Sequence, residues 1–333
     1  MAGVLYFVTS YRNPRQTLRL VATIAGESRD AAILVHHDQF RTALDAADLR
    51  RAAPAAHLLG SPAPLEWGDF SVVDMHWRSF EWALRNRDFD WMILLSEQDY
   101  PVWPLDAVHR FLEESGVDAF IEAERVCPPA SGGNGLASNR YFYSYTSLPG
   151  AAGAHRVPVP WAPALRALRQ RAVDRVNRRP GRLFRAETYP DGMPTRFGVR
   201  RRTTPFSDSF DCWAGNAWFA LSRRAVAEVV SFTGAAPSYR RYYRRTIVPE
   251  ESATASIVLN SPGLRTAARN LHFERWSNRH SGHPDVLGRG DLEEIIGSGM
   301  PFARKFDLAV DPGVMDALDQ HRRRSTGAHH QTT

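Results

Sequence analysis

Residues 4–38, VLYFVTSYRNPRQTLRLVATIAGESRDAAILVHHD, decide the fold class. Two short apolar runs, Val4–Thr9 and Ala31–Val35, have the length and composition of buried strands. Between them, Gln16–Ala25 spaces its apolar residues as one face of a helix. A strand, a helix and a strand in so short a stretch form a βαβ unit, which implies a parallel sheet. We therefore expect ligands at the carboxyl ends of these strands, where His36 and Asp38 lie.

The same alternation continues along most of the chain. Further strands are expected at Trp91–Leu95, Val117–Glu122 and Phe210–Leu221, and further helices at Ser71–Arg87, Pro104–Ser115, Ser222–Phe232 and Glu250–Asn260. Ser71 with Asp74 has the pattern of a capping box, Gly116 ends one helix, and Pro249 opens another. We predict an α/β protein with a mixed, mainly parallel central sheet flanked by helices.

Two segments depart from this pattern. Residues 127–209 are rich in Gly, Pro and Arg, and we interpret them as an insertion that contacts a substrate or partner, with one helix expected at Ala162–Val176. Residues 320–333, which include HRRRSTGAHHQTT, are expected to form a disordered tail. The remainder, up to residue 312, is expected to form a single domain.

The composition is that of an ordinary globular protein. Of 333 residues, 43% are hydrophobic and 23% charged, which excludes collagen-like, low-complexity and wholly disordered chains. Two cysteines, Cys127 and Cys212, are too few for a disulfide scaffold, and the longest apolar runs are too short to span a bilayer. Because the start, MAGVLYFVTSYR, lacks the basic region of a signal peptide, we expect a cytoplasmic protein with reduced thiols.

Arginine carries almost all of the positive charge. The chain has 41 arginines but one lysine, Lys305, and a formal net charge of +6. This bias is typical of a GC-rich genome, so the retained lysine indicates a site that needs a compact ammonium, with chance as the alternative. The arginine-rich stretch 166–202 and a pI near 9.6 favour a second class of function, a nucleic-acid-binding protein. No zinc-finger or RNA-binding signature in the sequence supports that alternative.

Six stretches, in order along the chain, carry a family resemblance. They are ILVHHD (33–38), WGDFSVVD (67–74), FDWMILLSEQDYPVWPL (89–105), AGNAWFALSR (214–223), VPEESATASIVLNSP (248–262) and GDLEEIIGSGMPFARKFD (290–307). Together they resemble the core-2/I-branching glycosyltransferases, which include β-1,6-N-acetylglucosaminyltransferases and peptide O-xylosyltransferases; the chain resembles a bacterial member. The resemblance implies a GT-A type fold over residues 1–312 and an inverting transfer from UDP-glucose, UDP-N-acetylglucosamine or UDP-xylose. It also implies no metal cofactor, neither Mn²⁺ nor Mg²⁺.

The resemblance supplies a general base. The Pro-Asp-Glu motif of the family, whose Glu is the base, reads Pro249-Glu250-Glu251 here, so Glu251 is the expected base and Glu250 the alternative. A carboxylate in the first turn of a helix is kept ionised by the helix dipole. On the helix pattern alone, both residues would be acidic residues at a helix N-terminus with no catalytic role. A further alternative is a protein that binds a sugar nucleotide without catalysing transfer. The presence of both Glu251 and Lys305 argues against it.

For the leaving group, the family places a Lys against the donor diphosphate, and Lys305 stands there. An ammonium can replace a divalent cation as the group that stabilises the developing charge. The family also uses an Arg upstream of this Lys. Arg279 is the first candidate for that role, with Arg275 and His283 as alternatives.

The expected nucleotide and sugar contacts follow strand ends. The nucleotide contacts are Val8, His36, Asp38 and Trp67, where Trp67 either stacks on uracil or packs in the core. The residues expected at the donor sugar or its loop are Ser96, Asp99, Gly215 and Asn216, with Asp99 expected to order that loop. The acceptor contacts are Trp276 and Glu274, with Tyr141, Tyr143 and Tyr145 as further candidates. We expect a small-molecule or glycan acceptor, and neither nucleic acid nor a membrane span.

One pair of carboxylates keeps a metal-dependent reaction open. Glu97 and Asp99 follow a buried strand, and two carboxylates at that spacing can bind a hard cation. Asp88 and Asp90 spell an Asp-x-Asp motif, but they precede the strand and lie at its wrong end. Because Lys305 would duplicate the charge of a metal ion, we favour the metal-independent alternative.

Overall fold

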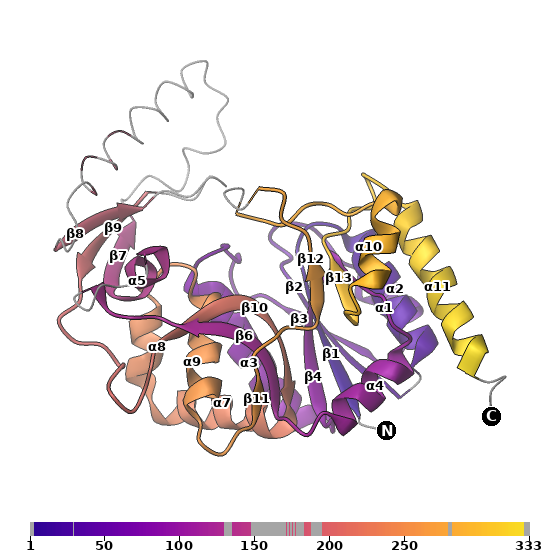
Figure 1. The fold of residues 1–333 in the computed structure, drawn as a ribbon, viewed down its shortest axis with the longest axis horizontal. Helices are drawn as coiled ribbons and strands as arrows, with labels where there is room; N and C mark the ends of the chain where they lie inside the picture. Colours follow the sequence, from indigo (N-terminus) through magenta and orange to yellow (C-terminus); the bar gives the residue numbers. More distant parts are fainter. Residues whose placement is uncertain are drawn as a thin grey trace.

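The computed structural model describes residues 3–28, 30–129, 135–147, 183–187, 195–278 and 282–329, together with Arg171, Val173, Arg175 and Asn177. These residues surround a seven-stranded central sheet (Figure 1). Its strand order is β11 (Thr266–Ala267), β6 (Ala119–Arg125), β10 (Trp213–Ser222), β4 (Trp91–Ser96), β1 (Val4–Ser10), β2 (Ala32–His37) and β3 (Ala56–Gly60). β10 runs antiparallel to its neighbours β4 and β6, while the other pairs are parallel. The sheet is therefore mixed and mainly parallel, as predicted.

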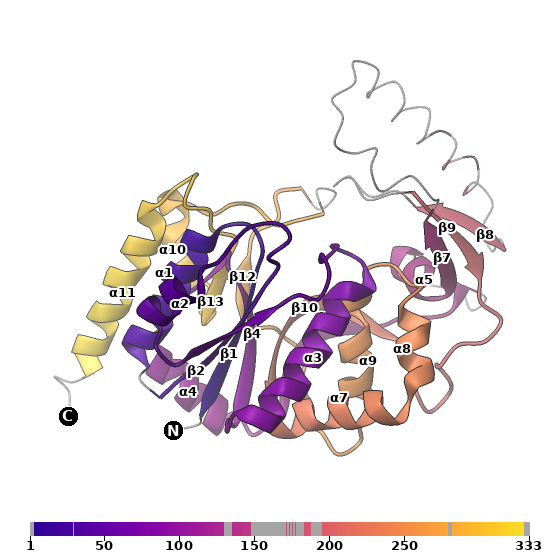
Figure 2. The ribbon, with the colours of Figure 1, turned by 180° about the vertical axis from the view of Figure 1, so that it is seen from behind.

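Helices cover both faces of the sheet (Figures 1 and 2). One face packs against α1 (Pro14–Glu27), α2 (Ala46–Ala52), α4 (Leu105–Glu114), α10 (Leu292–Gly297) and α11 (Gly313–His329). The other packs against α3 (Phe70–Asn86), α7 (Arg223–Ala235), α8 (Pro237–Tyr243) and α9 (Ala253–Asn260). Along β1, Leu5 and Phe7 enter one core and Tyr6 and Val8 the other. This alternation explains why the whole strand is apolar.

Two small sheets flank the central one. The first joins β12 (His272–Glu274), β13 (Phe302–Arg304) and β5 (Asp99–Pro101), and it brings the end of β4 beside the segment that carries Lys305. The second joins β7 (Tyr143–Ser147), β9 (Arg196–Arg200) and β8 (Phe184–Glu187). α5 (Gly135–Tyr141) and the second sheet belong to the insertion at residues 127–209. Most of the helix expected at residues 162–176 lies outside the described residues.

Two local predictions about helix starts were wrong. The N-cap of α3 is Asp69, whose carboxylate accepts the backbone N–H of Ser71 at 3.1 Å, so Ser71 and Asp74 form no capping box. Asp74 instead pairs with Arg240 at 2.6 Å. The helix expected from Glu250 is interrupted: Pro249–Glu251 form a 3₁₀ turn (η3), and α9 begins at Ala253 because Ser252 leaves the helical region with φ −134°.

The expected C-terminal tail is helical over most of its length. α11 continues to His329, so the prediction of disorder was wrong over residues 320–329, while residues 330–333 lie outside the described residues. Arg322 explains the difference, because its buried guanidinium donates to Glu27 at 2.7 Å and to the Pro101 carbonyl at 2.6 Å. Within the described ranges, no helix has both the length and the apolar character needed to cross a bilayer.

Candidate active site

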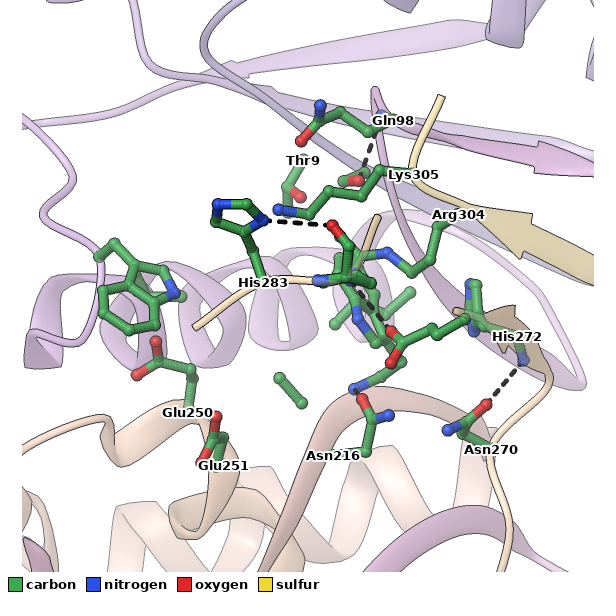
Figure 3. A pocket seen from close by; sticks show the side chains of 18 of the residues that line it. Thr9, Gln98, Asn216, Glu250, Glu251, Asn270, His272, His283, Arg304 and Lys305 are labelled. Atoms are coloured by element: carbon green, nitrogen blue, oxygen red, sulfur yellow. Dashed lines mark hydrogen bonds and ion pairs between the residues drawn. The ribbon is translucent and has the colours of Figure 1, made fainter. Parts of the chain in front are cut away.

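A cavity of about 1250 Å³ opens at the carboxyl ends of β1, β4 and β6 and at the start of β10. Segments far apart in the sequence line it, including the loop before α3, the η3 turn, β12 and the end of β13 (Figure 3). Parallel sheets place their ligand sites at this edge, because the strands end there and the loops that follow carry the functional side chains. The cavity is therefore the candidate active site.

Of the expected nucleotide contacts, Trp67 lines the cavity and is 41% exposed, whereas Val8, His36 and Asp38 are buried outside the cavity lining. The Asp38 carboxylate accepts the backbone N–H groups of Phe40 at 3.0 Å and Leu65 at 2.9 Å. Asp38 therefore orders the loop that leads to Trp67, and its expected contact with the nucleotide stays a prediction.

Two buried histidines lie close to this wall and are neutral. Burial lowers the pKa of His36 to about 4 and that of His76, which lines the cavity from α3, to about 3. The Nδ1 atom of each has no hydrogen-bond partner among the described residues. His76 was not predictable from the sequence, because a histidine on an apolar helix face gives no signal beyond core packing.

The η3 turn places two carboxylates in the cavity wall (Figure 3). Glu250 is buried, accepts the backbone N–H of Gly68 at 3.1 Å through Oε1, and buries Oε2 with no partner in the described structure. Burial, with a smaller contribution from Glu251, raises the pKa of Glu250 to about 8. Burial also raises the pKa of Glu251, but the neighbouring guanidinium of Arg140 opposes that effect.

Lys305 and His283 lie together in the cavity near Thr9 (Figure 3). Of the other expected diphosphate contacts, Arg279 lies outside the described residues. Arg275 does not line the cavity, because it pairs with Asp285 at 3.1 Å and also contacts Asp291. Among the described residues, His283 is therefore the candidate for the second diphosphate contact that lies beside Lys305.

A buried ionic chain connects the end of β4 with the expected acceptor side. Arg304 donates from Nε to Asp99 at 2.7 Å and from Nη1 to Glu274 at 3.1 Å, and Trp276 donates from Nε1 to Glu274 at 3.1 Å. Glu274 and Trp276 line the cavity, and Glu274 is already engaged by two donors. Asp99 is fully buried and orders the loop after β4, where it also accepts the backbone N–H of Ser96.

Arg304 is a cavity residue that the sequence analysis missed. Its guanidinium lies 4.0 Å from the ring centre of Trp218, and both residues line the cavity. His272 packs beside them with its ring 5.4 Å from Trp218, and burial lowers its pKa to about 4. A sequence signal existed for Arg304, since it directly precedes the single lysine, but nothing marked His272 or Trp218.

A bulge in β10 shapes the sugar side of the cavity. Gly215 pairs with Ala123 and Phe219 with Ile121, so three residues of β10 face one residue of β6. A Cβ on Gly215 would lie 2.2 Å from the carbonyl oxygen of Glu122, so the close strand approach requires glycine. Gly215 and Asn216 line the cavity, as does Ser96.

Two further groups of expected residues are buried outside the cavity lining. Tyr141, Tyr143 and Tyr145 are buried core residues and do not line the cavity, so they are not acceptor contacts. Glu97 is also buried, and its carboxylate accepts the backbone N–H groups of Tyr11 and Arg12, each at 2.9 Å. Glu97 thus fixes the loop after β1, and the described residues include no group of three or more His, Cys, Asp or Glu side chains suited to a metal ion.

Comparison with known families identifies the family of the chain. The family model of the Core-2/I-Branching enzyme matches residues 6–131 and 169–296. The chain therefore belongs to the Core-2/I-branching enzyme family, which confirms the resemblance seen in the sequence.

The chain is similar to named glycosyltransferases. It is 26% identical over 237 residues to Beta-glucuronosyltransferase GlcAT14B of Arabidopsis thaliana, covering 70% of this chain and 44% of that protein. It is 32% identical over 124 residues to Beta-glucuronosyltransferase GlcAT14A of Arabidopsis thaliana, covering 36% and 27%. With Xylosyltransferase 1 of Homo sapiens the identity is 24% over 276 residues, covering 77% and 23%. The chain spans less than half the length of each of these relatives.

Proposed function

We propose that this chain transfers a sugar from a UDP-sugar to an acceptor hydroxyl with inversion at the anomeric carbon. The observation that carries the proposal is the placement of Glu251 and Lys305, from separate segments, in the wall of one cavity. A base and a cation that share a cavity meet the two chemical requirements of the reaction, proton removal from the acceptor and charge stabilisation on the leaving diphosphate.

In the proposed step, Glu251 takes the proton of the acceptor hydroxyl while that oxygen attacks the anomeric carbon from the face opposite UDP. The bond between the anomeric carbon and the diphosphate oxygen breaks, and UDP leaves with the electron pair. Lys305 stabilises the negative charge that develops on the diphosphate, with His283 beside it in the cavity. Trp67 lines the same cavity and would stack on the uracil base.

Electrostatics favour Glu251 over Glu250 as the base. A general base must be ionised at the working pH. With a pKa of about 8, Glu250 is largely protonated near neutral pH, whereas Glu251 has a guanidinium partner that stabilises its ionised form. Glu250 instead ties the η3 turn to the Trp67 loop through Gly68.

We also propose that the reaction needs no metal ion. Lys305 supplies a cation in the cavity, while Glu97 and Asp99, the alternative metal ligands, are occupied by backbone and arginine donors. A metal-dependent transferase that uses Glu97 and Asp99 would have to break those contacts. The cytoplasm is the compartment in which we propose that the enzyme acts, and Cys127 and Cys212 would stay reduced there.

A screen of UDP-sugar donors tests the proposed function. The relatives' names add UDP-glucuronic acid to the candidates UDP-glucose, UDP-N-acetylglucosamine and UDP-xylose. We would measure UDP release with each donor, with and without EDTA, and with Glu251→Gln as the control. We expect one donor to give release that survives EDTA and is lost in the variant. Loss in EDTA with recovery in Mn²⁺ would support the metal-dependent alternative, and no release with any donor would contradict the proposal.

A further inference from the structure

The proposed base has a charged partner outside the matched family sequence. Arg140, on α5, donates from Nη1 to Glu251 Oε2 at 2.5 Å. The two side chains are 17% and 29% exposed, so the pair is partly shielded from water. Because the contact uses Oε2, the second oxygen of Glu251 is left to accept a proton. The family model matches residues 6–131 and 169–296, so α5 lies between the matched segments.

Hydrogen bonds from the backbone and from tyrosine side chains connect Arg140 to the η3 turn, which carries Glu251. The carbonyl of Arg140 accepts the backbone N–H of Ile247 at 3.4 Å, and the Tyr141 hydroxyl donates to the carbonyl of Val248 at 3.0 Å. Val248 directly precedes η3. The Tyr242 hydroxyl in turn donates to the Tyr141 carbonyl at 2.5 Å. The end of α5 and the turn therefore form one hydrogen-bonded unit, which limits how far the guanidinium can move from the carboxylate.

We infer that Arg140 is a positioning residue for Glu251, which fixes one carboxylate oxygen and keeps the base ionised in its partly buried site. The inference rests on the proposed function, in which Glu251 takes the acceptor proton. A partly buried carboxylate with no cation beside it becomes easier to protonate, and a protonated base cannot act. Arg140 would thus set the lower pH limit of the reaction.

The charged groups around Glu251 support this role. Arg140 and Tyr141 face it from α5, Glu250 precedes it in η3, and Glu274 approaches from β12. Burial and the negative charge of Glu274 both raise the pKa of Glu251, and Arg140 lowers it through its charge and its hydrogen bond. Removing Arg140 would leave the effects that favour the protonated form.

The test compares the pH dependence of kcat for Arg140→Gln, Arg140→Lys and a matched control, Arg240→Gln. Arg240 forms a similar pair with Asp74, at 2.6 Å and with exposures of 25% and 29%, outside the cavity lining. For Arg140→Gln we expect the acid limb of the profile, the range in which kcat falls as the pH is lowered, to move to higher pH by about one unit or more. Activity should then be about 10-fold lower than wild type at low pH and closer to wild type at high pH. Arg140→Lys, which keeps the charge, and Arg240→Gln should keep the wild-type limb.

A uniform loss of activity with an unmoved acid limb would overturn the inference, because it would show that Arg140 only supports the fold. Wild-type enzyme without activity on any donor would contradict the proposed function instead.

A second experiment tests the Arg140–Glu251 ion pair without measuring enzyme activity. It compares the free energy of unfolding of wild type, Arg140→Gln, Glu251→Gln and the double variant. The destabilisation by Arg140→Gln should be larger at pH 8 than at pH 5 and absent in the Glu251→Gln background, since the pair exists only while Glu251 is ionised. A destabilisation independent of pH and of Glu251 would overturn the inference.

Discussion

Arg304 joins β13 to β5 through its ion pair with Asp99, in which Nε and Oδ1 lie 2.7 Å apart. The two side chains are 9% and 0% exposed, and the pair is in register with the antiparallel pairing of β13 and β5. Lys305 follows Arg304 directly. The position of the proposed leaving-group lysine therefore depends on a buried ionic contact that is made one residue earlier.

Arg304→Met should destabilise the protein, because it leaves the carboxylate of Asp99 buried without its cation. Breaking one side of a buried pair costs about 3 to 5 kcal/mol of unfolding free energy. Urea unfolding measures the effect. The control is Arg289→Met, whose partner is Asp311 at 3.1 Å and whose side chain is 68% exposed, and it should cost less than about 1 kcal/mol. Equal costs for the two variants would show that the Asp99 pair does not hold the cavity wall together.

Glu251→Gln should abolish transfer while leaving binding of the UDP-sugar nearly intact. Losing a general base lowers the rate by on the order of 10²- to 10⁴-fold. Calorimetry and turnover on the same sample separate binding from chemistry. Glu250→Gln is the matched control and should stay active, since a neutral amide replaces a carboxyl that is largely protonated near neutral pH. If only Glu250→Gln loses activity, the roles of the two residues are exchanged.

Lys305→Ala should remove a charge-assisted contact to the leaving diphosphate and cost about 2 to 4 kcal/mol of transition-state stabilisation. That contact strengthens as charge develops, so kcat should fall more than donor affinity. Lys305→Arg separates charge from shape: if a compact ammonium is required, it will be impaired despite equal charge. Steady-state kinetics on both variants would decide this, and wild-type behaviour of Lys305→Arg would make the single lysine an accident of composition.

Glu250 should make stability depend on pH. Its pKa is raised from 4.5 to about 8, so between these values the folded state binds a proton that the unfolded chain has released. Stability should therefore fall as the pH rises through this window, and Glu250→Gln, neutral throughout, should escape that loss. We expect the variant to exceed wild type by on the order of 5 kcal/mol at pH 9 and to match it near pH 4.5. Thermal unfolding at the two pH values measures this, and a constant difference would contradict it.

The sequence predicts the central fold because both faces of its strands are buried. Leu5 and Phe7 enter one core and Tyr6 and Val8 the other, so an uninterrupted apolar run is itself the signal. The helix boundaries were less predictable. Asp69 rather than Ser71 caps α3, and Arg322 keeps a charged C-terminal segment helical through contacts with Glu27 and Pro101. Such contacts depend on parts of the chain that lie far apart in the sequence.

The site was predictable where a residue was chemically unusual. Lys305 is the single lysine and Glu251 stands in a motif, and both line the cavity. The role of Asp38 was less predictable, because a carboxylate at a strand end serves equally to bind a ligand or to order a loop, and only the distant N–H of Leu65 shows that it orders a loop here. Arg140 carried no signal at all, since it is one of 41 arginines and its partner lies more than a hundred residues away.

The single lysine also gives the protein an unusual chemical property. An amine-specific acylating reagent can modify one lysine side chain in this chain, and that side chain lies in the cavity. The extent of labelling at Lys305, read by mass spectrometry of the peptide that contains it, therefore reports directly on occupation of the site. A bound nucleotide diphosphate should slow the labelling, so candidate donors can be ranked on the unaltered protein before any acceptor is known.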